Sequence, residues 1–156
     1  MITKSFLLLS SFLLLASCGR DEEQVDTEKP VLTLGYAEAF PKSCAVLKRG
    51  ETYVFRARAT DNVGVASYGI DVHHNFDHHT HDDQPGVCAL DDKKNAVKPM
   101  IYMQNFSVPN ADKNFEIQQQ ITIPQDVDFG DYHCSISVTD QTGWQTRTSV
   151  DIKIIP

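Results

Sequence analysis

Apolar and polar residues alternate along the chain from Pro30 onward, and no segment there has the 3.6-residue period of an amphipathic helix. Turn residues separate the alternating runs, as in Asp61-Asn62-Val63-Gly64 and Asp140-Gln141-Thr142-Gly143. The pattern predicts seven strands, near residues 31–36, 52–60, 66–74, 101–106, 115–123, 131–139 and 145–155. Short antiparallel strands at this spacing are typical of an all-β sandwich.

One local motif refines this prediction to an immunoglobulin-like (Ig-like) sandwich. The segment Asp128-Phe129-Gly130-Asp131-Tyr132-His133-Cys134 resembles the tyrosine corner of Ig-like strand F. In that corner the tyrosine hydroxyl bonds back to the backbone and the cysteine faces the core. The cysteine expected on strand B is missing, since Ala57 and Ala59 lie there, and Tyr68 is the large residue nearest the place of the strand-C tryptophan. We therefore expect an Ig-like fold without the disulfide between strands B and F.

The first residues have the pattern of a targeting signal. Lys4 precedes an apolar run over residues 6–16, which is shorter than the about 20 residues needed to span a bilayer. The run ends in Leu15-Ala16-Ser17-Cys18, which resembles the bacterial lipobox. Residues 1–17 are therefore predicted to be a signal peptide, with Cys18 lipidated and the mature chain membrane-anchored. A plain secretory signal with a chance cysteine is the alternative.

Residues 18–29 are polar and aperiodic, which predicts a flexible acidic tether before an Ig-like domain over residues 30–156. Arg20-Asp21-Glu22-Glu23 resembles the surface-export signal of Bacteroidota lipoproteins. We expect an outer-membrane lipoprotein whose domain lies at the cell surface, and a solubilising linker that faces the periplasm is the alternative.

Charge and motif content exclude several function classes. The chain has 21 acidic and 14 basic residues, a net charge of −7, and no basic patch, so nucleic-acid binding is not expected. It has no nucleophile elbow, H-E-x-x-H sequence, phosphate loop or dinucleotide fingerprint. A metallohydrolase would need a general base, and Asp71, Asp77 and Asp82 are equivalent candidates. We therefore do not expect an enzyme.

The remaining cysteines are Cys44, Cys88 and Cys134, so at most one internal disulfide forms if Cys18 is lipidated. Cys134 follows the tyrosine corner and is expected in the core, where a thiol packs as a small hydrophobe. Cys44 and Cys88 lie in loop-like sequence and are the expected pair.

Histidine is concentrated in one segment, because five of the six histidines lie between His73 and His81. Imidazole binds zinc, copper, nickel and iron, and nearby carboxylates can complete or orient the shell. Ile70 and Val72 are expected in the core, so His73 should point to the outer face of its strand. Strand F lies beside strand C in an Ig-like sheet, and His133 should share that outer face.

The sequence therefore predicts a metal site with ligands from two strands and one loop: His73, His78, His79, His81, His133 and Asp77. Asp71, His74 and Asp82 are possible further ligands or hydrogen-bond partners of ligands. Zinc or copper is the expected metal, although the residue types do not choose between metals. A solvated histidine-rich loop and a pH-responsive loop without metal are the alternatives.

The chain also resembles a family of Bacteroidota outer-membrane lipoproteins with an Ig-like domain of unknown function. The resemblance covers about residues 29–156 and implies fold and location more than activity. It rests on Asp61-Asn62, Ser67-Tyr68-Gly69-Ile70-Asp71-Val72-His73, Asn75-Phe76-Asp77-His78-His79-Thr80-His81, Ile123-Pro124, Gly130-Asp131-Tyr132-His133 and Thr139-Asp140.

Two functions remain open from the sequence. The first is a lipid-anchored extracytoplasmic protein that binds a transition-metal ion, for capture or for hand-over to a partner such as an outer-membrane transporter. The second is a structural or adhesive Ig-like module that binds protein or glycan, with a histidine loop that is structural or without function.

Overall fold

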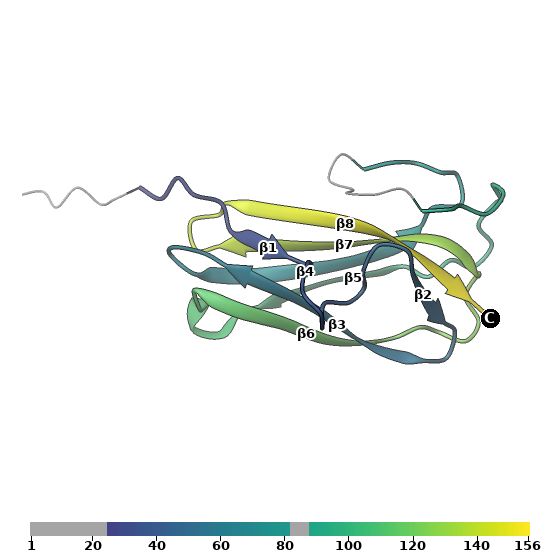
Figure 1. The fold of residues 1–156 in the computed structure, drawn as a ribbon, viewed down its shortest axis with the longest axis horizontal. Helices are drawn as coiled ribbons and strands as arrows, with labels where there is room; N and C mark the ends of the chain where they lie inside the picture. The colour runs from purple at the N-terminus through teal and green to yellow at the C-terminus, as the bar shows by residue number, and fades with distance from the viewer. Residues whose placement is uncertain (1–24, 82–87) are drawn as a thin grey trace, which may run out of the picture.

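The computed structural model describes residues 25–81 and 88–156 and confirms the predicted all-β sandwich (Figure 1). One sheet has three strands in the order β1 (Val31–Thr33), β3 (Thr52–Thr60) and β6 (Asn114–Thr122). The other has five, in the order β2 (Ala45–Lys48), β8 (Gln145–Ile155), β7 (Gly130–Asp140), β4 (Val65–His74) and β5 (Tyr102–Ser107). Neighbouring strands are antiparallel except for β2 and β8, which are parallel. A short 3₁₀ turn, Pro109–Ala111, joins β5 to β6.

The predicted strand boundaries agree closely with those of the structure, with two differences. The first predicted strand extends to residue 36, whereas β1 ends at Thr33. The second difference is β2, a four-residue strand that the pattern did not predict and in which Leu47 alone is buried. So short a run has almost no alternation to detect, and β2 is a strand because it pairs with the edge of β8.

The core lies between the two sheets and is formed by the alternate, inward-facing residues of each strand. On β3, Phe55, Ala57 and Ala59 are fully buried, and β4 contributes Ile70 and Val72 from the facing sheet. Ala57 and Ala59 are the small residues that stand where an Ig domain would have its strand-B cysteine. Two inward-facing residues of β4 thus fix Asp71 and His73 on the outer face of the larger sheet.

The tyrosine corner is present at the start of β7. The Tyr132 hydroxyl donates a hydrogen bond to the Asp128 carbonyl oxygen (2.6 Å) and accepts one from the Met100 amide (3.1 Å). Cys134 is fully buried, and this burial raises the pKa of its thiol. Strands β7 and β4 are therefore the F and C strands of the Ig-like fold, and their register places His73 opposite His133.

The described residues of the connection from β4 to β5 contact the outer face of the larger sheet. Cys88 in this connection forms a disulfide with Cys44, the residue before β2 (Cα–Cα 5.5 Å), which is the pairing expected from their loop-like sequence. Asp91 is held by Lys153 Nζ on β8 (2.6 Å), and its amide donates to Asp131 Oδ2 (2.7 Å). Among the residues that the structure describes, no helix is long and apolar enough to cross a membrane.

Candidate metal centre

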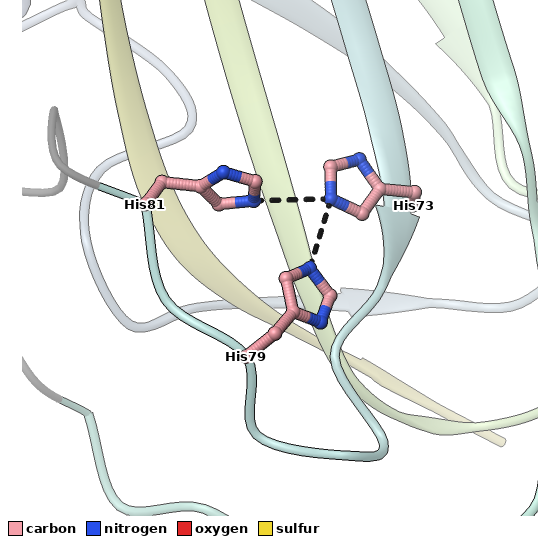
Figure 2. A group of neighbouring side chains, drawn as sticks. All are labelled: His73, His79 and His81. Atoms are coloured by element: carbon pink, nitrogen blue, oxygen red, sulfur yellow. Dashed lines mark hydrogen bonds between the residues drawn. The ribbon is translucent and has the colours of Figure 1, made fainter.

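Three histidine side chains converge where β4 ends and the following loop turns back (Figure 2). His73 Nε2 lies 3.2 Å from His81 Nε2 and 3.3 Å from His79 Nε2. One ring nitrogen from each histidine lies within 4.8 Å of the other two. The three residues form what we call the histidine triad: His73 from the rigid strand, and His79 and His81 from the loop.

A tight turn directs the loop back toward β4. The Asn75 amide donates to the Asp131 carbonyl oxygen (2.8 Å), and the His78 amide donates to the Asn75 carbonyl oxygen (3.2 Å). His78 has a φ of +61°, the left-handed conformation that reverses the chain. Phe76 is 2% exposed and packs edge-on against Tyr132, with ring centroids 5.3 Å apart. The turn is thus anchored in the core, and the residues that follow it return to His73.

Two carboxylates determine which ring nitrogens carry protons. Asp71 Oδ1 lies 2.9 Å from His73 Nδ1, and Asp77 Oδ1 lies 2.7 Å from His79 Nδ1. An ionised carboxylate can only accept, so both Nδ1 atoms are the N–H donors. The hydrogen bond from His79 lowers the pKa of Asp77 to about 2, which keeps this carboxylate ionised. Carboxylates in this position are typical partners of metal-binding histidines.

With the protons on Nδ1, the Nε2 atoms of neutral His73 and His79 both present lone pairs, 3.3 Å apart. Two lone pairs at this distance repel one another unless a proton or a metal cation lies between them. In a tetrahedral zinc shell with Zn–N near 2.0 to 2.1 Å, neighbouring nitrogens are separated by about 3.3 Å. The two Nε2 separations at His73 are close to that value, and the third pair lies within 4.8 Å, so the triad could hold a metal ion.

His133 lies beneath the triad, and both of its ring nitrogens face oxygen atoms. The residue is fully buried, with its ring centroid 4.7 to 5.6 Å from those of the triad. Its Nε2 donates to the His79 carbonyl oxygen (3.1 Å), and its Nδ1 lies 2.9 Å from Asp151 Oδ1. Burial lowers the pKa of His133, although the His79 carbonyl and the Asp151 carboxylate act in the opposite direction. His133 therefore supports the loop backbone at His79, and its Nδ1, which has no aligned hydrogen-bond partner among the described residues, faces Asp151 and not the triad.

The other predicted site residues lie outside the triad. His78 Nε2 donates to the Asp91 carbonyl oxygen (2.9 Å), which holds its ring against the returning segment. His74 faces the opposite side of β4 and packs on Phe76, with ring centroids 4.9 Å apart. Asp82 and Cys18 lie outside the residues that the structure describes. Of the proposed ligands, the structure thus brings together His73, His79 and His81, and it places Asp71 and Asp77 as their hydrogen-bond partners.

Asp151 on β8, whose Oδ1 lies 2.9 Å from His133 Nδ1, was not predicted from the sequence as a residue of the site. The register of β7 and β8 places the two residues opposite each other, and Asp151 is 4% exposed. Its neighbours Val150 and Ile152 are buried as well. An acidic residue within an apolar strand next to strand F was the available signal, because a buried carboxylate requires a partner.

Comparison with known proteins gives a family and one structural likeness. A family model described as a domain of unknown function (DUF4625) matches residues 16–155. No curated protein matches the chain. Among solved structures, the chain is similar to a mutant of the SrpA adhesin from Streptococcus sanguinis, with a TM-score of 0.48 and 17% sequence identity. The match covers 84% of this chain and 57% of that chain, so this chain spans little more than half the length of the adhesin.

Proposed function

The chain belongs to the DUF4625 family, whose description names no activity, and we propose that it binds one transition-metal ion through His73, His79 and His81. The observation that carries this proposal is the pair of carboxylates on the far side of two triad rings. They place the protons of His73 and His79 on Nδ1 and leave the Nε2 lone pairs free where the three rings converge. A cation at that point removes the repulsion between the lone pairs.

The donor set favours zinc or divalent copper. Imidazole nitrogens suit both ions, whereas monovalent copper prefers thiolate and thioether sulfur. Cys134 is buried on the inner side of β7, and Cys44 and Cys88 are joined in a disulfide, so these three cysteines present no thiolate to the triad. Three protein ligands in a tetrahedral shell leave a fourth position for water or an incoming donor.

This open position supports capture or hand-over of the ion rather than catalysis. A metal-dependent hydrolase needs a general base beside the open position. Of the three candidate bases, Asp82 lies outside the described residues, and Asp71 and Asp77 hold the Nδ1 atoms on the outer side of the triad rings, away from the open position. A donor group from another protein can instead occupy the fourth position and take over the ion.

The proposed setting is the outer membrane, with the chain anchored through a lipid on Cys18 and the domain at the cell surface or on the periplasmic side. Residues 25–30 enter the sandwich at one end, and the loop that follows β4 lies at the other (Figure 1). An anchor at the first end would direct the triad away from the membrane, toward soluble metal. An outer-membrane transporter is the proposed recipient of the ion.

The test is elemental analysis of untagged protein after dialysis against zinc or copper and removal of loose metal. We expect near-stoichiometric retention of one metal, and loss of retention when His73 and His79 are replaced together by alanine. His78→Ala is the matched control, because His78 belongs to the same loop but bonds to the Asp91 carbonyl. If the wild-type protein retains no metal, or if His78→Ala loses it equally, the proposal is wrong and the structural or adhesive alternative takes its place.

A further inference from the structure

A second group of ligand atoms lies at the end of the sandwich opposite the histidine triad. It consists of Asp26 before β1, Asp61 directly after β3 and Asp140 at the end of β7. One carboxylate oxygen from each lies within 4.8 Å of the other two. On β4, Val65 pairs with Asp140, whereas His73 is eight residues further along. At a rise of about 3.3 Å per residue the two sites are roughly 26 Å apart.

Two of these carboxylates are buried and only half satisfied. Asp61 is 9% exposed and Asp140 is 2% exposed. Asp61 Oδ1 accepts the amides of Val63 (2.9 Å) and Gly64 (2.7 Å). Asp140 Oδ1 accepts three amides of the β7–β8 turn, at 2.7 to 2.9 Å. The Oδ2 atom of each residue is buried, and no hydrogen-bond donor of the described chain reaches it.

An unpartnered buried carboxylate oxygen is costly, because it gives up its bonds to water without gaining others. In residues 25–81 and 88–156, no lysine or arginine forms an ion pair with any of the three carboxylates. Asp26 is nevertheless held against the other two: Asn62 Nδ2 donates to its Oδ1 (2.8 Å) and Thr142 Oγ1 to its Oδ2 (3.0 Å). The three carboxylates therefore share this end of the sandwich.

We propose that Asp26, Asp61 and Asp140 bind a calcium ion, which fastens the segment before β1 to the β3–β4 and β7–β8 turns. All three donors are carboxylate oxygens, which suit hard cations and differ from the imidazoles of the triad. Calcium binds oxygen at about 2.3 to 2.6 Å, so ligands up to about 5 Å apart can share one ion. Magnesium requires a smaller, near-octahedral shell and releases its water reluctantly, which suits a buried and irregular site less well.

The ion would determine how the chain enters the domain. Asp26 contributes to the site from the segment that precedes β1, whereas Asp61 and Asp140 belong to the rigid ends of two strands. Without the ion, mutual repulsion of the carboxylates opposes docking of Asp26. With it, the chain is held to the end of the sandwich from Asp26 onward. This role does not depend on the histidine triad.

Trp144 provides a built-in reporter, because it is the single tryptophan of the chain and its Nε1 donates to the Asp26 carbonyl oxygen (3.1 Å). The experiment titrates chelator-stripped, untagged protein with calcium chloride and follows tryptophan fluorescence and the thermal midpoint. We expect one saturable transition, with a Kd on the order of 10⁻⁴ to 10⁻³ M as in extracellular calcium modules. The thermal midpoint should rise over the same concentration range.

Two variants test the assignment of ligands. Asp140→Asn should weaken calcium binding at least about tenfold, since it removes a charged ligand. Asp26→Asn should also weaken calcium binding at least about tenfold. Asp26 lies on a partly exposed segment outside the strands, so this substitution does not put the folding of the domain at risk. Asp92→Asn, an equal charge change at an exposed position, should bind as the wild type does. The double alanine variant of His73 and His79 should keep the full calcium response.

Three results would overturn the proposal. The first is the absence of any saturable change in wild-type fluorescence or thermal midpoint up to about 10 mM calcium. The second is an unchanged calcium affinity in Asp26→Asn. The third is an equal response to magnesium, which would make the site a general cation site and not a calcium site.

Discussion

Replacing Asp71 by asparagine tests whether a carboxylate behind the ring controls metal binding at the triad. Asp71 Oδ1 lies 2.9 Å from His73 Nδ1, and Asp71 and His73 side chains are 31% and 26% exposed. Asparagine keeps the size of the side chain but is neutral and can present either an oxygen or an amino group. The substitution therefore weakens the bond that holds the proton on Nδ1 and permits the other tautomer, in which Nε2 carries the proton and cannot bind metal.

The expected loss follows from the role of Asp71 as a partner of a ligand. Removal of such a partner typically lowers metal affinity about 10-fold to 100-fold, which corresponds to about 1.4 to 2.7 kcal/mol of binding free energy. Asp77 makes the equivalent bond to His79, but its side chain is 69% exposed. Because solvent screens an exposed pair more strongly, Asp77→Asn should reduce the affinity less than Asp71→Asn.

Zinc affinity is measured by competition with a chromophoric chelator at neutral pH, on untagged protein freed of metal. Asp92→Asn is the matched control, since it removes one exposed negative charge outside the triad. The combination of Asp71→Asn with His73→Ala completes a double-mutant cycle. If Asp71 acts through His73, the double variant binds zinc no more weakly than His73→Ala alone.

Two results would refute this reasoning. Wild-type zinc affinity in Asp71→Asn, together with a large loss in His73→Ala, would show that the carboxylate does not control the ring. Fully additive effects in the cycle would show that Asp71 acts on the ion independently of His73. In both variants the thermal midpoint of the metal-free protein must stay close to that of the wild type, so that a loss of affinity is not a loss of fold.

Two further predictions concern stability. Backbone amides lower the pKa of Asp128, so the stability that its ionised carboxylate contributes is present above the ordinary aspartate pKa of about 3.9 and is lost as the pH falls through the lower pKa of the folded state. Asp128→Asn should therefore reduce the acid dependence of the unfolding free energy below that pH. An identical pH profile in the variant would argue against this contribution. Replacing Cys44 and Cys88 together by serine opens a cross-link with a sequence separation of 44, which should lower the unfolding free energy by up to about 4 kcal/mol, and no change in calorimetry would contradict this.

The sequence predicted most of the strands because a side-chain period of two is a local property. The ranges 52–60 and 145–155 coincide with β3 and β8, whose inward residues alternate regularly. The tyrosine corner also identified β7 as strand F and placed His133 on the same outer face as His73, and the register in the structure sets the two residues opposite each other. Strand β2 was not predictable in this way, since four residues contain little alternation and its pairing partner lies about a hundred residues further along the chain.

Tertiary structure alone decided which histidines meet. His73, His79 and His81 converge because a turn anchored by Phe76 returns the loop to β4, and the same turn sends His78 to the Asp91 carbonyl. His133 points to the outer face as the alternation predicted, but the folded-back loop buries it there.

The aspartate group shows the same division between local and distant information. Asp61 and Asp140 were recognisable as turn residues, because an Asp at a strand end binds nearby backbone amides. That Asp26 joins them depends on where three chain segments, distant in sequence, end in space. Alternation and turn chemistry are encoded by neighbouring residues, whereas the meeting of ligand atoms depends on loop paths that the packed sandwich determines.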